Sequence, residues 1–182
     1  MTKRILITGH AGFIGSHTVQ HFLENTDWEV VGIDSFEHKG DPLRISDFNY
    51  SWKRFKTYAC DLSVPMGARL ESKLGKIDAI INMASESHVD RSIEDPVPFV
   101  QNNINLTLNM LEYARRVKPE IFIQVSTDEV YGSARANHSF KEWDTLLPSN
   151  PYSASKAAQE MLAISYWRTY GLPITITNTV NN

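Results

Sequence analysis

Short apolar segments alternate with longer amphipathic segments along the whole chain, and this alternation constrains the fold more than any other feature. Several short segments are apolar on both faces, as strands buried inside a parallel sheet must be. Strands are predicted at residues 4–8, 29–34, 55–61, 78–84, 121–127 and 174–180. Helices are expected near residues 13–25, 64–75, 97–117 and 152–169. Alternating strands and helices predict right-handed crossovers and a doubly wound α/β fold with a parallel sheet.

Length and composition restrict the class of protein. The 182 residues suggest one domain, and the net charge of −3 does not indicate a nucleic-acid or membrane partner. The single cysteine, Cys60, excludes a disulfide within the chain and favours a reducing, cytoplasmic location. No stretch approaches the ~20 apolar residues of a membrane helix. Two polar segments that directly follow strands, residues 35–50 and 132–151, resist assignment and are expected to be ligand-binding loops.

A glycine-rich segment, TGHAGFIGS, joins the first expected strand to the first expected helix. Gly9, Gly12 and Gly15 would allow a tight turn and a close approach of a pyrophosphate to the backbone at a helix N-terminus. Asp34 ends the second expected strand, where a carboxylate accepts hydrogen bonds from a ribose diol and repels a 2′-phosphate. The pattern predicts a dinucleotide site that prefers NAD to NADP. A plain strand-to-helix turn, with Asp34 as a turn residue, is the alternative.

A second group of residues is suited to acid–base chemistry. Tyr152 and Lys156 are four residues apart at an expected helix start, so their side chains share one helix face. We expect the ammonium to lower the phenol pKa from its ordinary value of about 10. Thr127 ends an expected strand and is followed by two adjacent acids, Asp128 and Glu129. These acids could form a solvated turn, or one could be protonated and the other ionised to serve as an acid–base pair.

In combination these motifs resemble the extended short-chain dehydrogenase/reductase superfamily. Within it the chain is most similar to the nucleoside-diphosphate-sugar 4,6-dehydratases, above all those that act on dTDP-glucose. The resemblance rests on VSTDEVYG (125–132), SESHVDRSI (85–93), NPYSASKAAQE (150–160) and RTYGLPITITN (168–178). It implies that residues 1–182 form a Rossmann-like NAD-binding domain with the catalytic residues, and that a substrate-binding lobe is expected beyond residue 182.

The resemblance also implies a reaction with roles for the catalytic residues. Tyr152 would deprotonate the sugar 4-hydroxyl as hydride passes from C4 to NAD, while Thr127 holds the substrate oxygen and Lys156 the nicotinamide ribose. Glu129 would remove the C5 proton, and Asp128 would protonate the 6-hydroxyl that leaves as water. Return of the hydride to C6 would regenerate NAD and give the 4-keto-6-deoxy sugar.

The remaining site residues follow from the same resemblance. The expected NAD contacts are Gly9, Gly12, Phe13, Ile14, Gly15, Asp34, Ser35, Asp61, Leu62, Ala84, Ser85, Ser87, Asn102, Tyr152, Lys156 and Asn182. The expected substrate contacts are Ser87, Thr127, Asp128, Glu129 and Asn181. Asp61 could instead cap the following helix. Asn102 stands where the family usually has threonine, and Leu106 where it usually has glycine. No metal ion is expected.

Three functions remain open on the sequence. The first is a 4,6-dehydratase or its cofactor-binding half. The second is an NAD-dependent sugar-nucleotide epimerase or decarboxylase, against which Asp128 argues because UDP-glucuronate decarboxylases typically have serine there. The third is a non-catalytic NAD-binding module. A homodimer is expected, because members of the superfamily commonly pair through two helices that correspond to residues 97–117 and 152–169.

Overall fold

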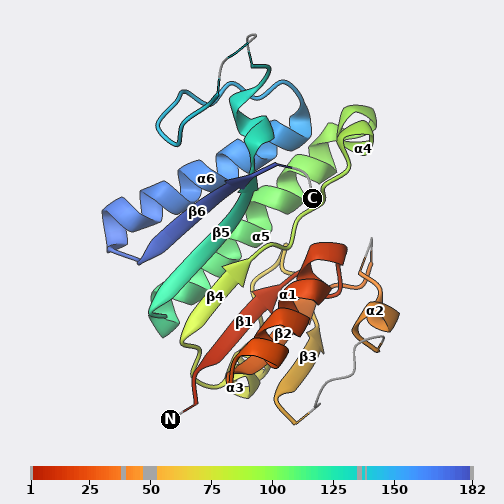
Figure 1. The fold of residues 1–182 in the computed structure, drawn as a ribbon, viewed down its shortest axis with the longest axis vertical. Helices are drawn as coiled ribbons and strands as arrows, with labels where there is room; N and C mark the ends of the chain where they lie inside the picture. The colour runs from red at the N-terminus through yellow and green to blue at the C-terminus, as the bar shows by residue number, and fades with distance from the viewer. Residues whose placement is uncertain (1, 38–39, 47–52, 135–136, 138, 181–182) are drawn as a thin grey trace.

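A single parallel sheet organises the part of the chain that the computed structural model describes, residues 2–37, 40–46, 53–134, 137 and 139–180. Within these residues six strands lie in the order β3-β2-β1-β4-β5-β6, and every neighbouring pair is parallel (Figure 1). The strands are β1 (Arg4–Thr8), β2 (Glu29–Asp34), β3 (Phe55–Ala59), β4 (Ala79–Asn82), β5 (Ile121–Thr127) and β6 (Ile174–Thr179). This is the strand order of a doubly wound, Rossmann-like fold, so the predicted fold class is confirmed.

Helices cover the sheet from both sides. They are α1 (Phe13–Asn25), α2 (Pro42–Ser46), α3 (Ala68–Leu74), α4 (Val89–Glu94), α5 (Pro96–Val117) and α6 (Pro151–Tyr170), with a 3-10 turn η1 (Asp128–Tyr131). Side chains of α1 pack into a core on one face of the sheet, whereas those of α3, α5 and α6 pack into a core on the other. The two layers leave the carboxyl ends of the strands, where ligands bind in such folds, at one edge of the molecule.

The central strands are apolar because both of their faces are buried. On β1, Ile5 and Ile7 point into the core beneath α1, while Leu6 points into the core beneath α5, and all three are 2% exposed or less. Burying one such side chain contributes roughly 1.5–3 kcal/mol. The uninterrupted apolar runs of the sequence therefore correspond to interior strands, as predicted.

Several element boundaries differ from the sequence-based expectation. The fourth strand ends at Asn82 instead of residue 84, because the N–H groups of Met83 and Ala84 both donate to the Thr8 hydroxyl over 3.1 Å. α3 begins at Ala68 instead of residue 64, and Asp61 does not cap it. The Asp61 carboxylate instead accepts from the Ser63 N–H over 2.8 Å and closes a local turn. The third strand ends at residue 59, and the short helices α2 and α4 had not been predicted.

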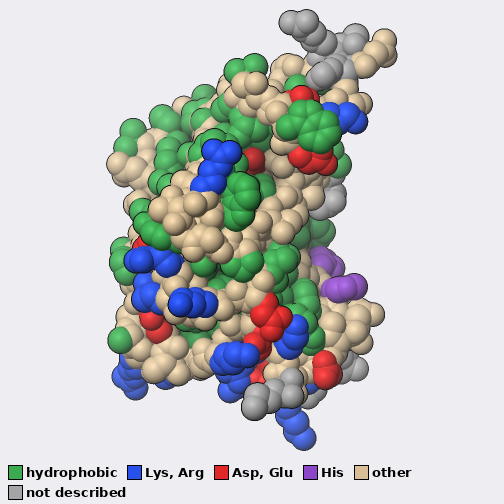
Figure 2. Space-filling view, turned by 90° about the vertical axis from the view of Figure 1, so that its left-hand side faces the viewer, with side chains coloured by type: hydrophobic (Ala, Val, Ile, Leu, Met, Phe, Trp, Pro, Cys, Tyr) green, Lys and Arg blue, Asp and Glu red, His purple; other side chains and the backbone are tan. Residues whose placement is uncertain are grey.

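The surface carries charges of both signs. On the face in Figure 2, basic and acidic side chains lie interspersed among polar and apolar ones. Among the described helices, none combines the length and the apolarity needed to cross a membrane.

Candidate active site

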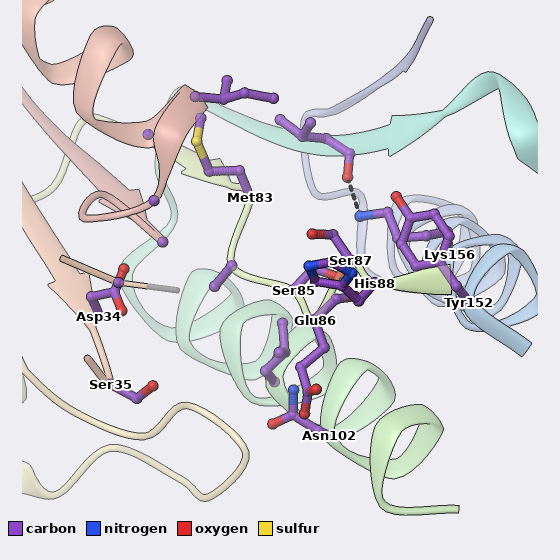
Figure 3. A pocket seen from close by; sticks show the side chains of 18 of the residues that line it. Asp34, Ser35, Met83, Ser85, Glu86, Ser87, His88, Asn102, Tyr152 and Lys156 are labelled. Atoms are coloured by element: carbon purple, nitrogen blue, oxygen red, sulfur yellow. Dashed lines mark hydrogen bonds between the residues drawn. The ribbon is translucent and has the colours of Figure 1, made fainter. Parts of the chain in front are cut away.

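A cavity of about 910 Å³ lies at the carboxyl ends of the strands. It occupies the crevice between β1 and β4, from which the strand order runs outward in opposite directions. Figure 3 shows Asp34 and Ser35 on one side of it and Tyr152 and Lys156 on the other. The predicted cofactor residues that line it are Gly9, Gly12, Phe13, Ile14, Gly15, Asp34, Ser35, Asp61, Leu62, Ala84, Ser85, Ser87, Asn102, Tyr152 and Lys156. The remaining one, Asn182, and the predicted substrate contact Asn181 lie outside the described residues.

The glycine loop forms a cradle at the start of α1 that is packed so tightly against backbone that it has no room for side chains at Gly9 and Gly15. Gly9 has φ +70°, and a Cβ there would lie 2.9 Å from the Ala84 Cα atom. A Cβ on Gly15 would lie 2.1 Å from the Gly9 carbonyl oxygen. Gly12 is the N-cap of α1 and supplies no capping side chain, so the first N–H groups of the helix are left for an anion. The cradle therefore fits the pyrophosphate of a dinucleotide.

A buried histidine anchors this loop to the sheet. His10 is 0% exposed, and its Nε2 atom forms a 2.7 Å hydrogen bond with the Thr57 hydroxyl on β3. The ring packs edge-on against Phe36 and lies so close to β2 that a Cβ on Gly32 would be 2.4 Å from its Cγ atom. Burial lowers the pKa of His10, against the opposing influence of the Ile33 carbonyl and Asp34. The neutral ring thus fixes the loop over β2 and β3.

Asp34 is held in place at the far end of the cavity. Its Oδ2 atom accepts from the Ala11 N–H over 3.1 Å, and its Oδ1 atom accepts from the Phe36 N–H over 3.0 Å. A carboxylate has further lone pairs, so it can still accept hydrogen bonds from a diol. Glu37 and Arg44, which the sequence analysis did not single out, line the same end. Arg44 Nη1 donates to the Ala11 carbonyl over 3.4 Å, which holds the loop from the opposite side.

The catalytic turn begins where β5 ends. The Thr127 hydroxyl donates to Asp128 Oδ1 over 3.2 Å and accepts from the Glu129 N–H over 3.3 Å, which starts η1. Glu129 lines the cavity, and its Oε2 atom accepts from Asn150 Nδ2 over 3.4 Å. Asp128 does not line the cavity. Both acids had been expected to enter it, but the tight 3-10 turn directs neighbouring side chains to different sides.

Tyr152 and Lys156 reach the cavity from the first turns of α6. The side chain of Asn150 caps this helix by accepting from the Ser153 N–H over 2.8 Å, and Pro151 occupies its first position. The Tyr152 N–H donates to the Ser92 hydroxyl over 3.1 Å, which ties the start of α6 to α4. The predicted helix start and the shared face of the two side chains are both present.

The electrostatics of this pair differ from the prediction. Burial and the negative charge of Glu129 raise the pKa of Tyr152, while a hydrogen bond with Thr127 acts in the opposite direction. Lys156 is 4% exposed, and its Nζ atom donates to the Val125 carbonyl over 2.7 Å (Figure 3). Burial lowers the pKa of Lys156 to about 8. The expectation of a lowered phenol pKa is therefore wrong for this arrangement, because burial and Glu129 raise it and Lys156 is not among the groups that shift it.

Asn103, a residue missed in the sequence, holds the segment that crosses the middle of the cavity. Its Oδ1 atom accepts from the Glu86 N–H over 2.8 Å, and its Nδ2 atom donates to the Glu86 carbonyl and to the Ser155 hydroxyl, each over 2.9 Å. This fully buried amide thus connects the segment that contains Ser85 and Ser87 to α6. Asn102 and Leu106, the two departures from the expected pattern, both line the cavity.

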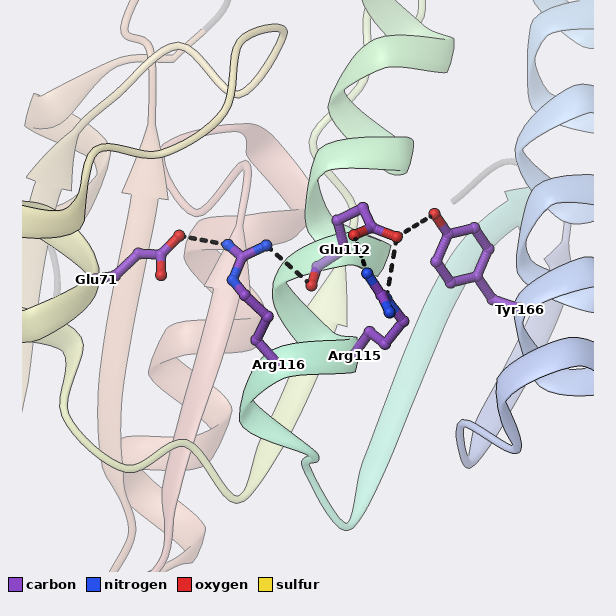
Figure 4. A network of polar contacts seen from close by, with 5 residues as sticks. All are labelled: Glu71, Glu112, Arg115, Arg116 and Tyr166. Atoms are coloured by element: carbon purple, nitrogen blue, oxygen red, sulfur yellow. Dashed lines mark hydrogen bonds and ion pairs between the residues drawn. The ribbon is translucent and has the colours of Figure 1, made fainter.

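A polar network outside the cavity joins the helices that support it (Figure 4). On α5, Glu112 accepts from Arg115 Nη2 over 2.8 Å and from the Tyr166 hydroxyl of α6 over 2.6 Å. Arg116 pairs with Glu71 of α3. The hydrogen bonds from Arg115 and Tyr166 hold the pKa of Glu112 below its ordinary value. The network fixes α6, and hence Tyr152 and Lys156, against α5.

Comparison with known proteins agrees with this geometry. The sequence model of a family described as GDP-mannose 4,6 dehydratase matches residues 6–182. The chain belongs to this family. It is 39% identical over 179 residues to the low-salt glycan biosynthesis protein Agl12 of Haloferax volcanii, covering 98% of this chain and 56% of that protein. It is 38% identical over 197 residues to dTDP-glucose 4,6-dehydratase 1 of Escherichia coli K12, covering 98% of this chain and 54% of that enzyme.

Solved structures of a 4,6-dehydratase and of an epimerase are both similar to this chain. DesIV, the dTDP-glucose 4,6-dehydratase of Streptomyces venezuelae with NAD and TYD bound, has a TM-score of 0.88 and 37% identity, over 96% of this chain and 55% of that one. A UDP-glucose 4-epimerase of Thermus thermophilus in complex with NAD has a TM-score of 0.85 and 30% identity, over 96% and 54%. The chain thus spans about half the length of the curated relatives and solved structures it matches.

Proposed function

We propose that this chain binds NAD and belongs to an enzyme that removes water from a nucleoside-diphosphate hexose, with dTDP-glucose as the substrate, to give the 4-keto-6-deoxy sugar. The observation that supports this most is that Glu129 and Tyr152 line the same cavity as the glycine cradle. The Glu129 carboxylate and the Tyr152 phenol then face the end of the cavity where the nicotinamide of a dinucleotide would lie. The names of the relatives favour the same reaction.

The residues of the cavity provide for NAD along its whole length. Gly9, Gly12 and Gly15 line the cavity, where the uncapped N–H groups at the start of α1 would bind the pyrophosphate, and Asp34 is held where it could accept from the adenosine ribose diol. At the other end Lys156 would bind the nicotinamide ribose. Bound there, NAD would supply a reversible hydride acceptor. The charge of Asp34 would exclude the 2′-phosphate of NADP.

Tyr152 and Thr127 would act on the sugar 4-hydroxyl. Because its pKa is raised, Tyr152 holds its proton at neutral pH in this chain. It can accept a proton from the substrate only when positive charge close to its oxygen favours the phenolate. The ammonium of Lys156 and the cationic nicotinamide ring of the cofactor are the groups suited to this. Thr127, which hydrogen-bonds to Tyr152, would keep the phenol oriented.

Glu129 and Asp128 would divide the elimination between them. Glu129 lines the cavity and is suited to remove the C5 proton. Asp128 is held by the Thr127 hydroxyl at the edge of the turn, so its role as the acid for the 6-hydroxyl requires the substrate to approach from that side. A substrate-binding lobe beyond residue 182 would determine that approach, and it would also provide most contacts to the nucleotide.

Product analysis of the complete reading frame tests the proposal. With dTDP-glucose and NAD, we expect a product lighter by one water and with a carbonyl at C4, measured by mass spectrometry and NMR. The structural similarity to epimerases supports a second candidate, which would give a C4 epimer of unchanged mass. Recovery of that epimer, or NAD binding with no reaction of any sugar nucleotide, would replace the proposed function.

A further inference from the structure

One buried carboxylate near the cavity has no part in the proposed reaction. Glu160 lies on α6 one turn after Lys156 and is 4% exposed. Its Oε1 atom accepts a hydrogen bond from Asn178 Nδ2 over 2.6 Å. Burying a carboxylate costs free energy that its partners must offset, and apolar replacements of buried ionic groups often stabilise a fold. Stability alone therefore does not account for a glutamate at this position.

Asn178 connects this carboxylate to the catalytic turn. The same Nδ2 atom donates to the Thr127 carbonyl over 3.3 Å. Asn178 lies on β6 and pairs in register with Ser126, so one amide group bridges α6, β6 and the last residue of β5. Thr127 is the residue from which η1 begins and whose hydroxyl binds the Glu129 N–H. The Glu160–Asn178 pair thus holds the point where the catalytic turn starts.

We propose that Glu160 is a positioning residue that acts through Asn178 to fix the Thr127 carbonyl, and so the direction in which Glu129 enters the cavity. The effect on reaction rate rests on the proposed function. The clamp itself, defined as the hydrogen bonds that join Glu160, Asn178 and Thr127, is a property of the fold. It can therefore be tested without a substrate.

The charge of Glu160 has a second effect, which can be separated from the clamp. The groups that act electrostatically on Glu160 or respond to it are Lys156, Ser126, Asn178 and Tyr131. Burial raises the pKa of Glu160, against the opposing effects of Ser126, Asn178 and Lys156. The carboxylate in turn opposes the lowering of the Lys156 pKa by burial. It therefore keeps Lys156 protonated to a higher pH than burial alone would allow.

Substitutions at two positions distinguish the clamp from the charge. Glu160→Gln keeps the size and the oxygen that accepts from Asn178 but removes the charge. Glu160→Leu keeps much of the side-chain volume and removes the oxygen that accepts from Asn178. Asn178→Ala removes the donor, and it tests the clamp if the leucine variant does not fold. Glu24→Gln is the control, because Glu24 is also a hydrogen-bonded glutamate but lies on α1, away from the clamp and from the network that supports α6.

Amide hydrogen exchange of residues 126–131 tests the clamp in the purified chain. We expect Glu160→Leu and Asn178→Ala to speed exchange in this segment about tenfold, as loss of a hydrogen bond of ordinary strength predicts. Glu160→Gln and Glu24→Gln should leave exchange in the segment unchanged. Unchanged exchange in both clamp variants overturns the proposal.

Kinetics of the complete protein with dTDP-glucose test the consequence. In the two clamp variants we expect kcat to fall about tenfold or more with KM within about twofold, because a misplaced base affects the reaction and not substrate binding. Glu160→Gln should keep kcat near neutral pH but move its alkaline limit to lower pH. Wild-type kcat in variants with faster exchange refutes the positioning role. A wild-type protein without dehydratase activity contradicts the proposed function, while the exchange measurement still decides the clamp.

Discussion

The neighbouring carboxylates Asp128 and Glu129 occupy different surroundings although they are adjacent in the chain. Glu129 faces the cavity, and Asp128 is bonded to the Thr127 hydroxyl at its edge. The sequence indicated that these acids have separate tasks, and the 3-10 turn gives a physical basis for the difference. The spacing of Tyr152 and Lys156 predicted their shared face but not the direction of the Tyr152 pKa shift. That direction depends on burial, which sequence spacing does not reveal.

Substitution of Glu129 separates the two halves of the proposed reaction. In the complete enzyme, Glu129→Gln should allow oxidation at C4 but leave the C5 proton in place. Reduced nicotinamide should then accumulate on the protein, and turnover should fall about 100-fold or more, as loss of a general base predicts. Tyr152→Phe should give no reduced nicotinamide, because the first proton transfer is lost. The absorbance of reduced nicotinamide after mixing measures both, and normal water loss by Glu129→Gln would show that another group is the base.

Asp34 should determine the choice of cofactor. Its carboxylate is fixed by the N–H groups of Ala11 and Phe36, so it cannot easily move away from a 2′-phosphate. We expect Asp34→Ser to weaken NAD binding by about tenfold or more, because a hydrogen bond to a charged group is lost. The preference of the chain for NAD over NADP should become smaller. Titration of the purified chain with both dinucleotides measures this, with Glu37→Gln as a control at the same end. Equal or tighter binding of NADP by the unsubstituted chain contradicts the assignment.

At the scale of helices and strands, long apolar or periodic segments were predicted well, and short polar ones were not. α1 was predicted at its observed bounds, and α5 and α6 to within one residue at each end. α2 and α4 span five and six residues and carry no periodic apolar face that a sequence pattern would reveal. The ends of β4 and α3 were misplaced because side chains, Thr8 and Asp61, bind the backbone there. The Thr8 contact joins residues 75 positions apart, which no local pattern reveals, whereas Asp61 forms a local turn where a helix cap was the alternative considered.

The contact between α5 and α6 should depend on pH through Glu112. Its folded-state pKa is lowered, so it contributes stability that is present above the ordinary pKa of a glutamate and is lost as the pH falls through the folded-state value. Tyr166→Phe and Glu112→Gln should each lower the free energy of unfolding by up to about 1 kcal/mol at pH 7, as expected for a partly exposed network. Denaturant unfolding measures the difference in the free energy of unfolding between wild type and each variant. This difference should be smaller at pH values below the ordinary glutamate pKa than at pH 7. A difference that is constant with pH excludes the charge of Glu112 as its origin.

At the scale of the whole molecule, the described surface of the two long helices is suited to self-association. Leu108 on α5 and Met161 and Trp167 on α6 are 36%, 49% and 54% exposed. Tyr166, next to Trp167 on α6, is by contrast buried and donates to Glu112. We propose that α5 and α6 pair with those of a second copy. Light scattering at micromolar concentration should give the mass of a dimer, and replacement of Met161 and Trp167 by glutamate should give a monomer; a monomer before substitution refutes the pairing.

Residues 1–182 alone should bind NAD but turn over dTDP-glucose slowly. The cavity provides the cofactor contacts and the acid–base residues, whereas relatives of this chain are almost twice as long. Remote contacts orient a reacting group and can remove roughly 7–11 kcal/mol of its barrier. Turnover by residues 1–182 is compared with turnover by the complete reading frame, after NAD occupancy has been checked. Robust product from residues 1–182 would show that the substrate pocket lies within them.

The packing of His10 on Gly32 has a consequence for how this sequence can evolve. With the ring in place, any side chain at position 32 collides with it, since even a Cβ would lie 2.4 Å from the ring. Replacing His10 by a smaller residue removes that obstacle and lets β2 carry the branched side chains that strands favour. The two positions must therefore change in a fixed order, residue 10 first and residue 32 second. A chain that keeps this histidine in the same position has room only for glycine at position 32.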